Sequence, residues 1–322
     1  MNPVEENTFG LHKDIAVFDF KSLYPSMMAS RNISWETKRT QGYEVDFTVP
    51  KNLRDWNKGT ASVCYSKEDL GILPKAVLSM MKLRDEYKAN RKNAKTDEEY
   101  RKWDSAQMAT KRAVNAFYGV LAKDGYGWGD MEMAQSITAS AREAMRSVAF
   151  KAIELGYKVI YGHTDSIFVQ VKDVNDAEAL CLLLNQYIRN EVFNECVELE
   201  FEKYAKTFFL SKKKNRYCGY LSWKDGEYID DEFFVMGFEM KKSNETKIAK
   251  TFQKTVLQMV ASSKSEEEVT DYARKLYKEI IKGDVDFKEV IKRSRLRNPL
   301  EEYKSIAGGV AGVLFYILLK DF

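Results

Sequence analysis

Two aspartates stand where strands are expected to end, and together they could bind metal ions. Asp19 follows the apolar run 15–18, which is typical of a buried strand, and Asp165 lies at the tip of a predicted strand–turn–strand at 158–171. A carboxylate in such a position is costly unless an opposite charge, usually a divalent cation, compensates it. Each aspartate alone could instead cap a helix or occupy a turn. If the sheet brings the two together, they form a site for two metal ions.

Residues that could bind a phosphate chain lie on two predicted helices. Arg84 and Lys88 are four residues apart, as are Lys111 and Asn115, so the members of each pair share one helix face. Arginine suits bidentate contact with phosphate, whereas lysine acts as a point charge. Between residues 75 and 112, basic residues outnumber acidic ones by eleven to six. A solvated helix face would show the same pattern, so these pairs alone do not establish a phosphate site.

The elements that must position these residues are predicted from hydrophobic periodicity. A period near 3.6 over 75–93, and a second helical stretch that ends near 118, predict an antiparallel helical hairpin. Residues 1–14 are expected to form a loop. Polar and apolar residues alternate at 43–49 and 61–66, which predicts strands. Further strands are expected at 197–203, 212–223 and 232–240, and further helices at about 131–155, 176–194, 245–262, 265–282 and 286–293.

Composition narrows the class of protein. The 322 residues are 44% hydrophobic and 31% charged, with a net charge of +3, which fits a globular protein with a sizeable core. The four cysteines form no C-x-x-C pair, so neither a zinc site nor a disulfide framework is expected, and a reducing cytoplasm is the default location. The most apolar segment, 309–319, is too short to span a bilayer, so no membrane association is expected.

Four segments together resemble the ordered motifs of family B DNA polymerases. They are DFKSLYPS at 19–26, KRAVNAFYG at 111–119, YGHTDS at 161–166 and KKKNRY at 212–217. Any one of them arises readily by chance, but four in the family's order make a strong signal. The resemblance runs from about residue 10 to about residue 313.

The resemblance implies an α+β fold of three parts: a palm, in which helices flank an antiparallel sheet, a fingers hairpin of two helices, and a mostly helical, incomplete thumb. GFEMKKSN at 237–244 resembles the palm-to-thumb transition, and RNPLEEYK at 297–304 resembles a thumb segment near the duplex. The expected boundaries are 1–73 and 119–240 for the palm, 74–118 for the fingers and 241–322 for the thumb.

The function that the resemblance implies is DNA-templated addition of deoxyribonucleotides to a primer 3′ end. Asp19 and Asp165 would bridge two Mg²⁺ ions, for which Mn²⁺ can substitute, and the carbonyl of Phe20 would add a ligand. The triphosphate would be bound by the N–H groups of Ser22 and Leu23 and by the side chains of Arg84, Lys88, Lys111 and Asn115. The resemblance also implies a catalytic role for Lys111.

Aromatic residues and a second basic segment complete the implied site. Tyr24 resembles the steric gate that excludes a 2′-hydroxyl, Tyr118 offers a ring for the nucleotide to pack on, and Gly119 would permit close approach of the templating base pair. Both tyrosines could instead be core residues. Glu200 and Glu202 could add a peripheral carboxylate. Contacts with primer-template DNA are expected from Lys214, Arg216, Tyr217, Lys241 and Lys242, although lysine runs are more often solvated edges.

One position departs from the family's pattern. The usual Y-G-D-T-D-S has a histidine here, His163, in place of its first aspartate, while the second, Asp165, is retained. The departure puts metal affinity and rate in doubt and motivates a rival hypothesis, a non-catalytic relative that binds DNA or serves as a scaffold. An RNA-making or reverse-transcribing enzyme is a weaker rival, which Tyr24 disfavours.

The family's amino-terminal and exonuclease domains have no counterpart in the residues ahead of the first motif. Proofreading by these 322 residues is therefore not expected, and the chain is interpreted as one piece of a split or truncated polymerase. Its expected partners are primer-template DNA and dNTPs, and the resemblance leaves open a separate polypeptide with the amino-terminal and exonuclease domains. The expected location is the cytoplasm, at a nucleoid or, for a viral protein, in a host.

Overall fold

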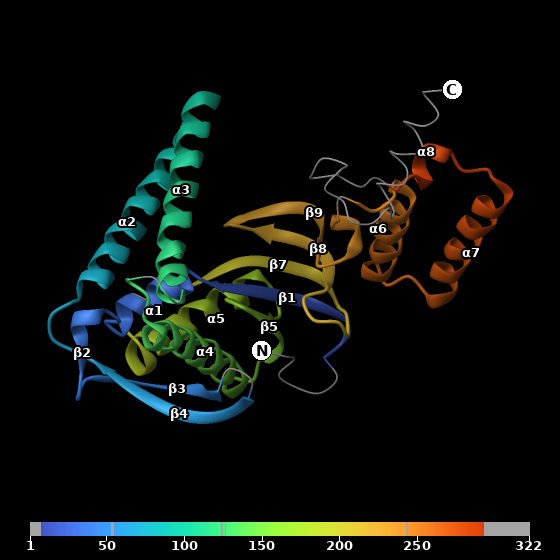
Figure 1. Cartoon of the computed structure of the whole chain (residues 1–322). Helices are drawn as coiled ribbons and strands as arrows, with labels where there is room; N and C mark the ends of the chain where they lie inside the picture. The colour runs from blue at the N-terminus through green and yellow to red at the C-terminus, as the bar shows by residue number, and fades with distance from the viewer. Residues whose placement is uncertain (1–7, 53–54, 124, 126, 243, 293–322) are drawn as a thin grey trace, which may run out of the picture. The chain divides into compact units, whose positions relative to one another are not determined.

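The computed structural model describes residues 8–52, 55–123, 125, 127–242 and 244–292. Contacts divide the chain into two compact units (Figure 1). The first unit contains residues 16–202, and the second contains residues 8–15 together with the described residues from 203 onward. The larger sheet has the strand order β5-β6-β1-β7-β8-β9, and two of its strands, β1 (Gly10–Phe20) and β7 (Leu199–Leu210), begin in one unit and end in the other.

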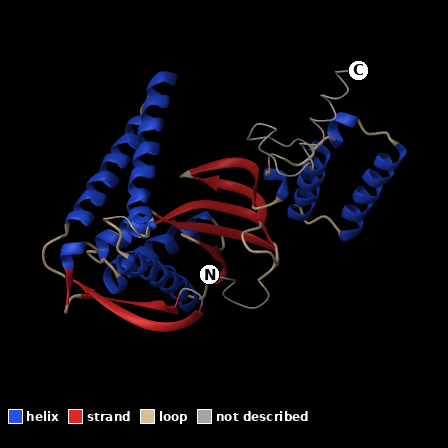
Figure 2. Cartoon of the chain, viewed as in Figure 1, coloured by secondary structure: helices blue, strands red, loops and turns tan. Residues whose placement is uncertain are grey.

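The first unit combines helices with two groups of strands (Figure 2). An antiparallel sheet of order β2-β4-β3 is formed by β2 (Lys38–Arg39), β3 (Tyr43–Asn52) and β4 (Asp55–Tyr65). An antiparallel hairpin of β5 (Lys158–His163) and β6 (Ser166–Gln170) lies next to β1. The helices are α1 (Leu23–Ser30), α2 (Ile72–Lys92), α3 (Asp97–Leu121), α4 (Met131–Glu154) and α5 (Val174–Tyr187).

Helix α4 forms the centre of this unit because small and apolar side chains cover much of its surface. It contacts the β5–β6 hairpin and also β3, α1 and α5, and it lies between the two sheets (Figure 1). Twelve of its residues are buried, among them Ile137, Ala144 and Val148. Alanine and serine at most of the other buried positions allow neighbouring backbones to approach closely. Asp130 caps the helix, since its side chain accepts a hydrogen bond from the N–H of Met133.

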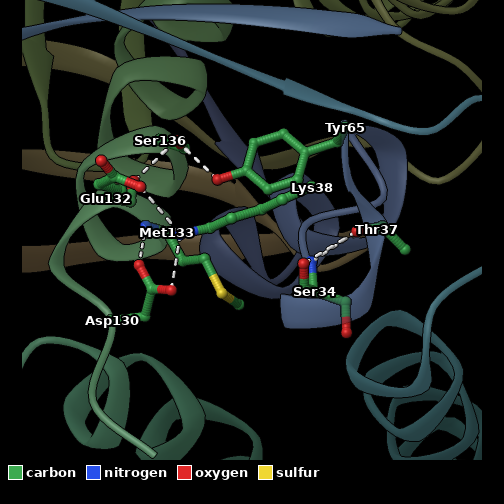
Figure 3. Close-up of polar contacts among 8 residues, drawn as sticks. All are labelled: Ser34, Thr37, Lys38, Tyr65, Asp130, Glu132, Met133 and Ser136. Carbon is green, nitrogen blue, oxygen red and sulfur yellow. Dashed lines mark hydrogen bonds and ion pairs between the residues drawn. The ribbon is translucent and has the colours of Figure 1, made fainter. Parts of the chain in front are cut away.

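Polar contacts join the first turns of α4 to the small sheet (Figure 3). The Lys38 ammonium lies 2.7 Å from an Asp130 carboxylate oxygen and 2.9 Å from Glu132. The fully buried Tyr65 donates its hydroxyl to Ser136 at 3.0 Å, and Ser136 donates to the carbonyl of Glu132 at 2.7 Å. A buried hydroxyl without a hydrogen-bond partner costs free energy, so these hydrogen bonds favour one packing of the small sheet on α4.

The second unit pairs strands with a helical group. Strand β7 pairs with β8 (Tyr217–Lys224), which pairs with β9 (Glu227–Met236), all antiparallel. A small core of Cys218, Val235 and Leu257 joins these strands to α6. The helices are α6 (Lys247–Ala261), α7 (Glu266–Lys282) and α8 (Phe287–Val290). In the part of the chain that the structure describes, no helix is both long and apolar enough to cross a bilayer.

The predicted α+β fold and the helical hairpin of α2 and α3 are confirmed. The prediction of a loop over residues 1–14 is wrong from Gly10 onward, where β1 begins. Residues 212–216 do not form a strand as predicted. They turn instead, with Asn215 at φ 60°, and β8 begins at Tyr217. Helix α8 is shorter than predicted. The segments 297–304 and 309–319 lie outside the described residues.

Candidate active site

The structure brings Asp19 and Asp165 to one cavity of about 370 Å³ in the first unit. Asp19 lies near the carboxyl end of β1, and Asp165 lies in the turn between β5 and β6, where Thr164 has a φ of 52°. The N–H of Phe20 donates to the carbonyl of Asp165 at 2.9 Å, and the hydroxyl of Ser166 donates to Asp19 Oδ1 at 2.6 Å. Backbone and side chain thus both tie the strand end to the turn.

The environment of Asp19 is unfavourable for a negative charge. Burial raises the pKa of its carboxyl to about 6, and repulsion from Asp165, Glu202 and Glu200 adds to the shift, against the opposing hydrogen bond from Ser166. Carboxylate and carbonyl oxygens are the ligands that Mg²⁺ and Mn²⁺ prefer, so this donor set fits a hard divalent cation. No cluster of three or more His, Cys, Asp or Glu side chains with metal-binding geometry occurs among the described residues.

The start of helix α1 faces the same cavity. Ser22, at the N-cap position, has a left-handed conformation (φ 52°, ψ 54°), and its side chain makes no capping bond. Its hydroxyl instead accepts a hydrogen bond from Arg84 at 3.3 Å. Leu23, Tyr24 and Pro25 form the first turn and line the cavity. The N–H groups of a helix's first turn and the helix dipole favour an anion at such an end. The structure places the start of α1, with Ser22 and Leu23, at the cavity.

The four expected phosphate-binding side chains line the cavity together. Arg84 and Lys88 extend from α2, and Lys111 and Asn115 extend from α3. Burial lowers the pKa of Arg84, and burial together with the like charge of Arg84 lowers that of Lys88. These cations are crowded and partly desolvated, so an anion placed between them would be bound more strongly than at an open surface.

The two tyrosines that were expected near the nucleotide lie next to each other. The rings of Tyr24 and Tyr118 lie 4.7 Å apart between centroids, tilted by 51°, and both line the cavity. Burial raises the pKa of Tyr24, and Tyr118 adds to the shift. Gly119 does not line the cavity, and a Cβ at this position would meet nothing within 4 Å. Protein neighbours therefore give no reason for glycine there.

The cavity also contains residues that the sequence did not single out. Lys21 and Thr164 line it, and so do the apolar side chains of Met81 and Val114. Glu200, considered only as a peripheral carboxylate, is a lining residue, whereas Glu202 is not. Lys21 lies within the segment DFKSLYPS, so its position was visible, but nothing in the sequence indicated what its side chain contacts.

His163 lies outside the cavity lining. It is half-buried at the end of β5, and its ring stacks on Tyr161 with centroids 6.3 Å apart and planes 8° apart. The residue that departs from the family's motif thus packs beside another aromatic ring and does not line the cavity that Asp19 and Asp165 share.

The five residues expected to contact DNA lie in the second unit. Lys214 is exposed in the turn between β7 and β8, and Lys241 is exposed in a 3₁₀ turn. Glu239 pairs with Arg216 at 3.1 Å and with Lys242. Tyr217 is buried and packs against Phe208, so little of its ring is available to a ligand.

A chain with this fold of helices and antiparallel strands, and with acidic and basic residues around one cavity, has relatives among known proteins. The chain belongs to DNA polymerase family B, which matches residues 4–314. Curated relatives include DNA polymerase 2 of Aeropyrum pernix, 29% identical over 301 residues, and a DNA polymerase of Archaeoglobus fulgidus, 28% identical over 310 residues. These alignments cover 92% and 95% of this chain but only 34% and 36% of the relatives.

A solved structure supports the same assignment. The family B DNA polymerase from Pyrobaculum calidifontis superposes with a TM-score of 0.66 at 27% identity, covering 98% of this chain and 38% of that structure. The chain therefore spans about a third of the length of its curated relatives and somewhat more of that solved structure.

The raised pKa of Asp19 predicts how stability depends on pH without metal. Between pH 3.8 and about 6 the folded protein retains a proton that the unfolded chain releases, so stability falls as pH rises through this window. The substitution Asp19→Asn removes this cost. With EDTA present, we expect the variant to be more stable than the wild type by about 1 kcal/mol at pH 7.5, after screening by solvent, and equally stable at pH 4.

Thermal unfolding across this pH range measures the difference. Glu178→Gln, on the exposed face of α5, is the matched control and should follow the wild type at every pH. A variant at Asp19 that is less stable than the wild type at pH 7.5 would contradict the assigned electrostatics.

Proposed function

We propose that this chain is the core of a DNA-templated DNA polymerase that adds deoxyribonucleotides to a primer 3′ end by two-metal nucleotidyl transfer. The observation that carries the proposal is the shared cavity, which holds Asp19 and Asp165 beside Arg84, Lys88 and Lys111. A metal-bound triphosphate requires acidic residues to bind the metal ions and basic residues to bind the phosphate oxygens. Membership of DNA polymerase family B supports the same activity.

Asp19, Asp165 and the carbonyl of Phe20 would hold two Mg²⁺ ions, with Mn²⁺ as a substitute. When bound, the ions lower the pKa of the primer hydroxyl and neutralise charge on the leaving pyrophosphate. The protein's own part begins with the bond from Ser166, which orients one oxygen of Asp19. Since Phe20 N–H donates to the backbone carbonyl of Asp165, the backbones that carry the two aspartates are joined before any ligand arrives.

Binding of the nucleotide would use the rest of the cavity. Arg84, Lys88 and Lys111 would contact phosphate oxygens, and Asn115 would donate a hydrogen bond from the same helix face as Lys111. The first turn of α1 would supply N–H groups and the positive end of its dipole. Catalysis in this scheme comes from position and charge, because no side chain forms a covalent bond to the substrate.

Tyr24 would select the sugar. Its ring is held against that of Tyr118 and lines the cavity, so it occupies a fixed volume beside the nucleotide. A 2′-hydroxyl that needs this volume would be excluded on steric grounds, which makes deoxyribonucleotides the substrate.

Contacts with the duplex would come from the second unit. Lys214 and Lys241 are exposed cations suited to phosphate, while Arg216 and Lys242 would exchange Glu239 for the DNA backbone. Such contacts fix register without reading sequence. The division into palm (1–73 and 119–240), fingers (74–118) and thumb (241–322) is part of the same proposal.

We further infer that proofreading comes from polypeptide outside these 322 residues, such as a separate chain with the amino-terminal and exonuclease domains. The match to DNA polymerase family B covers residues 4–314, all of which the proposed division assigns to palm, fingers and thumb. The proposal places the protein with its DNA in the cytoplasm, at a nucleoid or in a viral host.

A non-catalytic DNA-binding or scaffolding role is the second candidate, because His163 replaces an aspartate of the family's motif. Its position outside the cavity lining favours the catalytic proposal. Both candidates bind primer-template DNA, so binding alone does not separate them.

Primer extension separates the two candidates. With primer-template DNA, dNTPs and Mg²⁺, we expect extension by the wild type and a loss of at least about 1,000-fold in Asp19→Ala and in Asp165→Ala, because each removes a ligand that acts in the transition state. Glu178→Gln should extend primers normally. DNA binding without metal-dependent extension, with Mg²⁺ or Mn²⁺, would leave only the scaffolding role.

Replacement of Tyr24 tests sugar selection. We expect Tyr24→Ala to raise kcat/KM for ribonucleotides at least about tenfold relative to deoxyribonucleotides, because the volume of the ring becomes available to the 2′-hydroxyl. Tyr24→Phe, which keeps the ring, should retain the wild-type preference. Unchanged discrimination in Tyr24→Ala would remove the gate assignment while leaving polymerisation intact.

A further inference from the structure

Lys21 bonds to three different elements, yet the proposed chemistry assigns it no role. Its backbone N–H donates to the carbonyl of Glu198 at 2.9 Å, and its own carbonyl accepts from the hydroxyl of Ser26 in α1 at 2.9 Å. Its ammonium lies 3.1 Å from Asp85 Oδ2 in α2 and 3.6 Å from Glu198 Oε2. The residue thus joins the end of β1 to α1, to α2 and to the segment that precedes β7.

The contact with α2 is paired with a second one. Arg84 and Asp85 are consecutive in α2, and they contact the consecutive residues Ser22 and Lys21. The Arg84 contact is itself part of the cavity, but the Asp85 contact faces a neighbouring hollow of about 520 Å³ that Asp85 and Glu198 line and that Lys21 shares. Two adjacent contacts therefore hold α2 to the end of β1 at the turn that carries Arg84 and Lys88.

The charges on α2 explain why its contact with Lys21 matters. Arg84 and Lys88 both belong to α2, and burial together with the like charge of Arg84 lowers the pKa of Lys88, so placing this turn of α2 at the cavity is unfavourable without a stabilising contact. The Lys21 ammonium has two carboxylate partners, Asp85 at 3.1 Å and Glu198 at 3.6 Å, and its pairing with Asp85 supplies such a contact.

We propose that Lys21, paired with Asp85 and Glu198, is a positioning residue that holds α2 so that Arg84 and Lys88 face an incoming nucleotide triphosphate. The inference rests on the proposed polymerase function for its kinetic consequence, although the hold on α2 itself does not. Neither Lys21 nor Asp85 needs to touch the nucleotide. Their contribution is to hold the turn of α2 that presents both cations to the cavity.

Two measurements on a double-mutant cycle test the proposal. The variants are Lys21→Met, Asp85→Asn and both together, with Lys21→Arg to retain the charge and Glu86→Gln as the matched control. Glu86 is adjacent on α2 and exposed, so its substitution removes an equal charge without breaking the ion pair. Hydrogen exchange of the α2 amides is measured without nucleotide, and kcat and KM for dNTPs are measured by primer extension.

We expect faster exchange in α2 for Lys21→Met and Asp85→Asn, with the amides of α4 and α5 unchanged, and wild-type exchange for Lys21→Arg and Glu86→Gln. KM should rise about two- to fivefold with kcat nearly unchanged, as fits a partly exposed ion pair. The double variant should be no worse than either single variant.

The opposite results overturn the proposal. They are equal behaviour of Asp85→Asn and Glu86→Gln, faster exchange throughout the first unit, or additive effects in the double variant. If the wild type extends no primers, the proposed function fails by itself, and the exchange data alone still decide whether Lys21 holds α2.

Discussion

The main electrostatic constraint in the first unit is the crowding of carboxylates at the end of the buried strand β1. These carboxylates repel one another. Asp19 lies directly after a run of buried side chains and close to Asp165, Glu200 and Glu202, and its pKa rises accordingly. Burial and the neighbouring carboxylates make a negative charge on Asp19 unfavourable, and a bound cation would offset this cost. The proposed metal site depends on this balance.

The surrounding elements hold this charged centre in place. The bond from Phe20 N–H to Asp165 fixes the separation of two strand ends that are far apart in the sequence. Helix α4, buried between the sheets, supports the hairpin that carries Asp165. The hairpin of α2 and α3 adds Arg84, Lys88 and Lys111 to the lining of the same cavity. Acidic and basic side chains thus line one space of about 370 Å³, and the proposed binding of a metal-bound triphosphate rests on that combination.

Much of this arrangement could be predicted from the sequence, because strong signals mark it. An apolar run that ends in Asp19 predicted one strand end, a strand–turn–strand pattern placed Asp165 at a hairpin tip, and a spacing of four residues predicted that Arg84 and Lys88 share a face. The start of β1 was missed because residues 10–14 are mostly polar and are held in part by a tertiary bond, from Tyr204 to Asp14 at 2.7 Å.

Other features depend on contacts between distant segments and carry no local signal. The basic residues at 212–216 are as typical of an exposed edge strand as of a turn. Composition alone therefore could not tell whether this segment forms a strand or a turn. The partners of Lys21 are 64 and 177 positions away in the sequence, at Asp85 and Glu198. Likewise, only the structure shows that His163 stacks on Tyr161 and does not line the cavity.

Binding of Mn²⁺, followed by electron paramagnetic resonance, tests the paired-carboxylate centre most directly, because it requires neither primer nor turnover. The account predicts that the wild type binds Mn²⁺ in the presence of a dNTP, and that Asp19→Asn and Asp165→Asn each weaken the binding at least about tenfold, since each removes a charged oxygen ligand. Retention of wild-type Mn²⁺ affinity in both variants would contradict it, because the two aspartates would then not form the metal site.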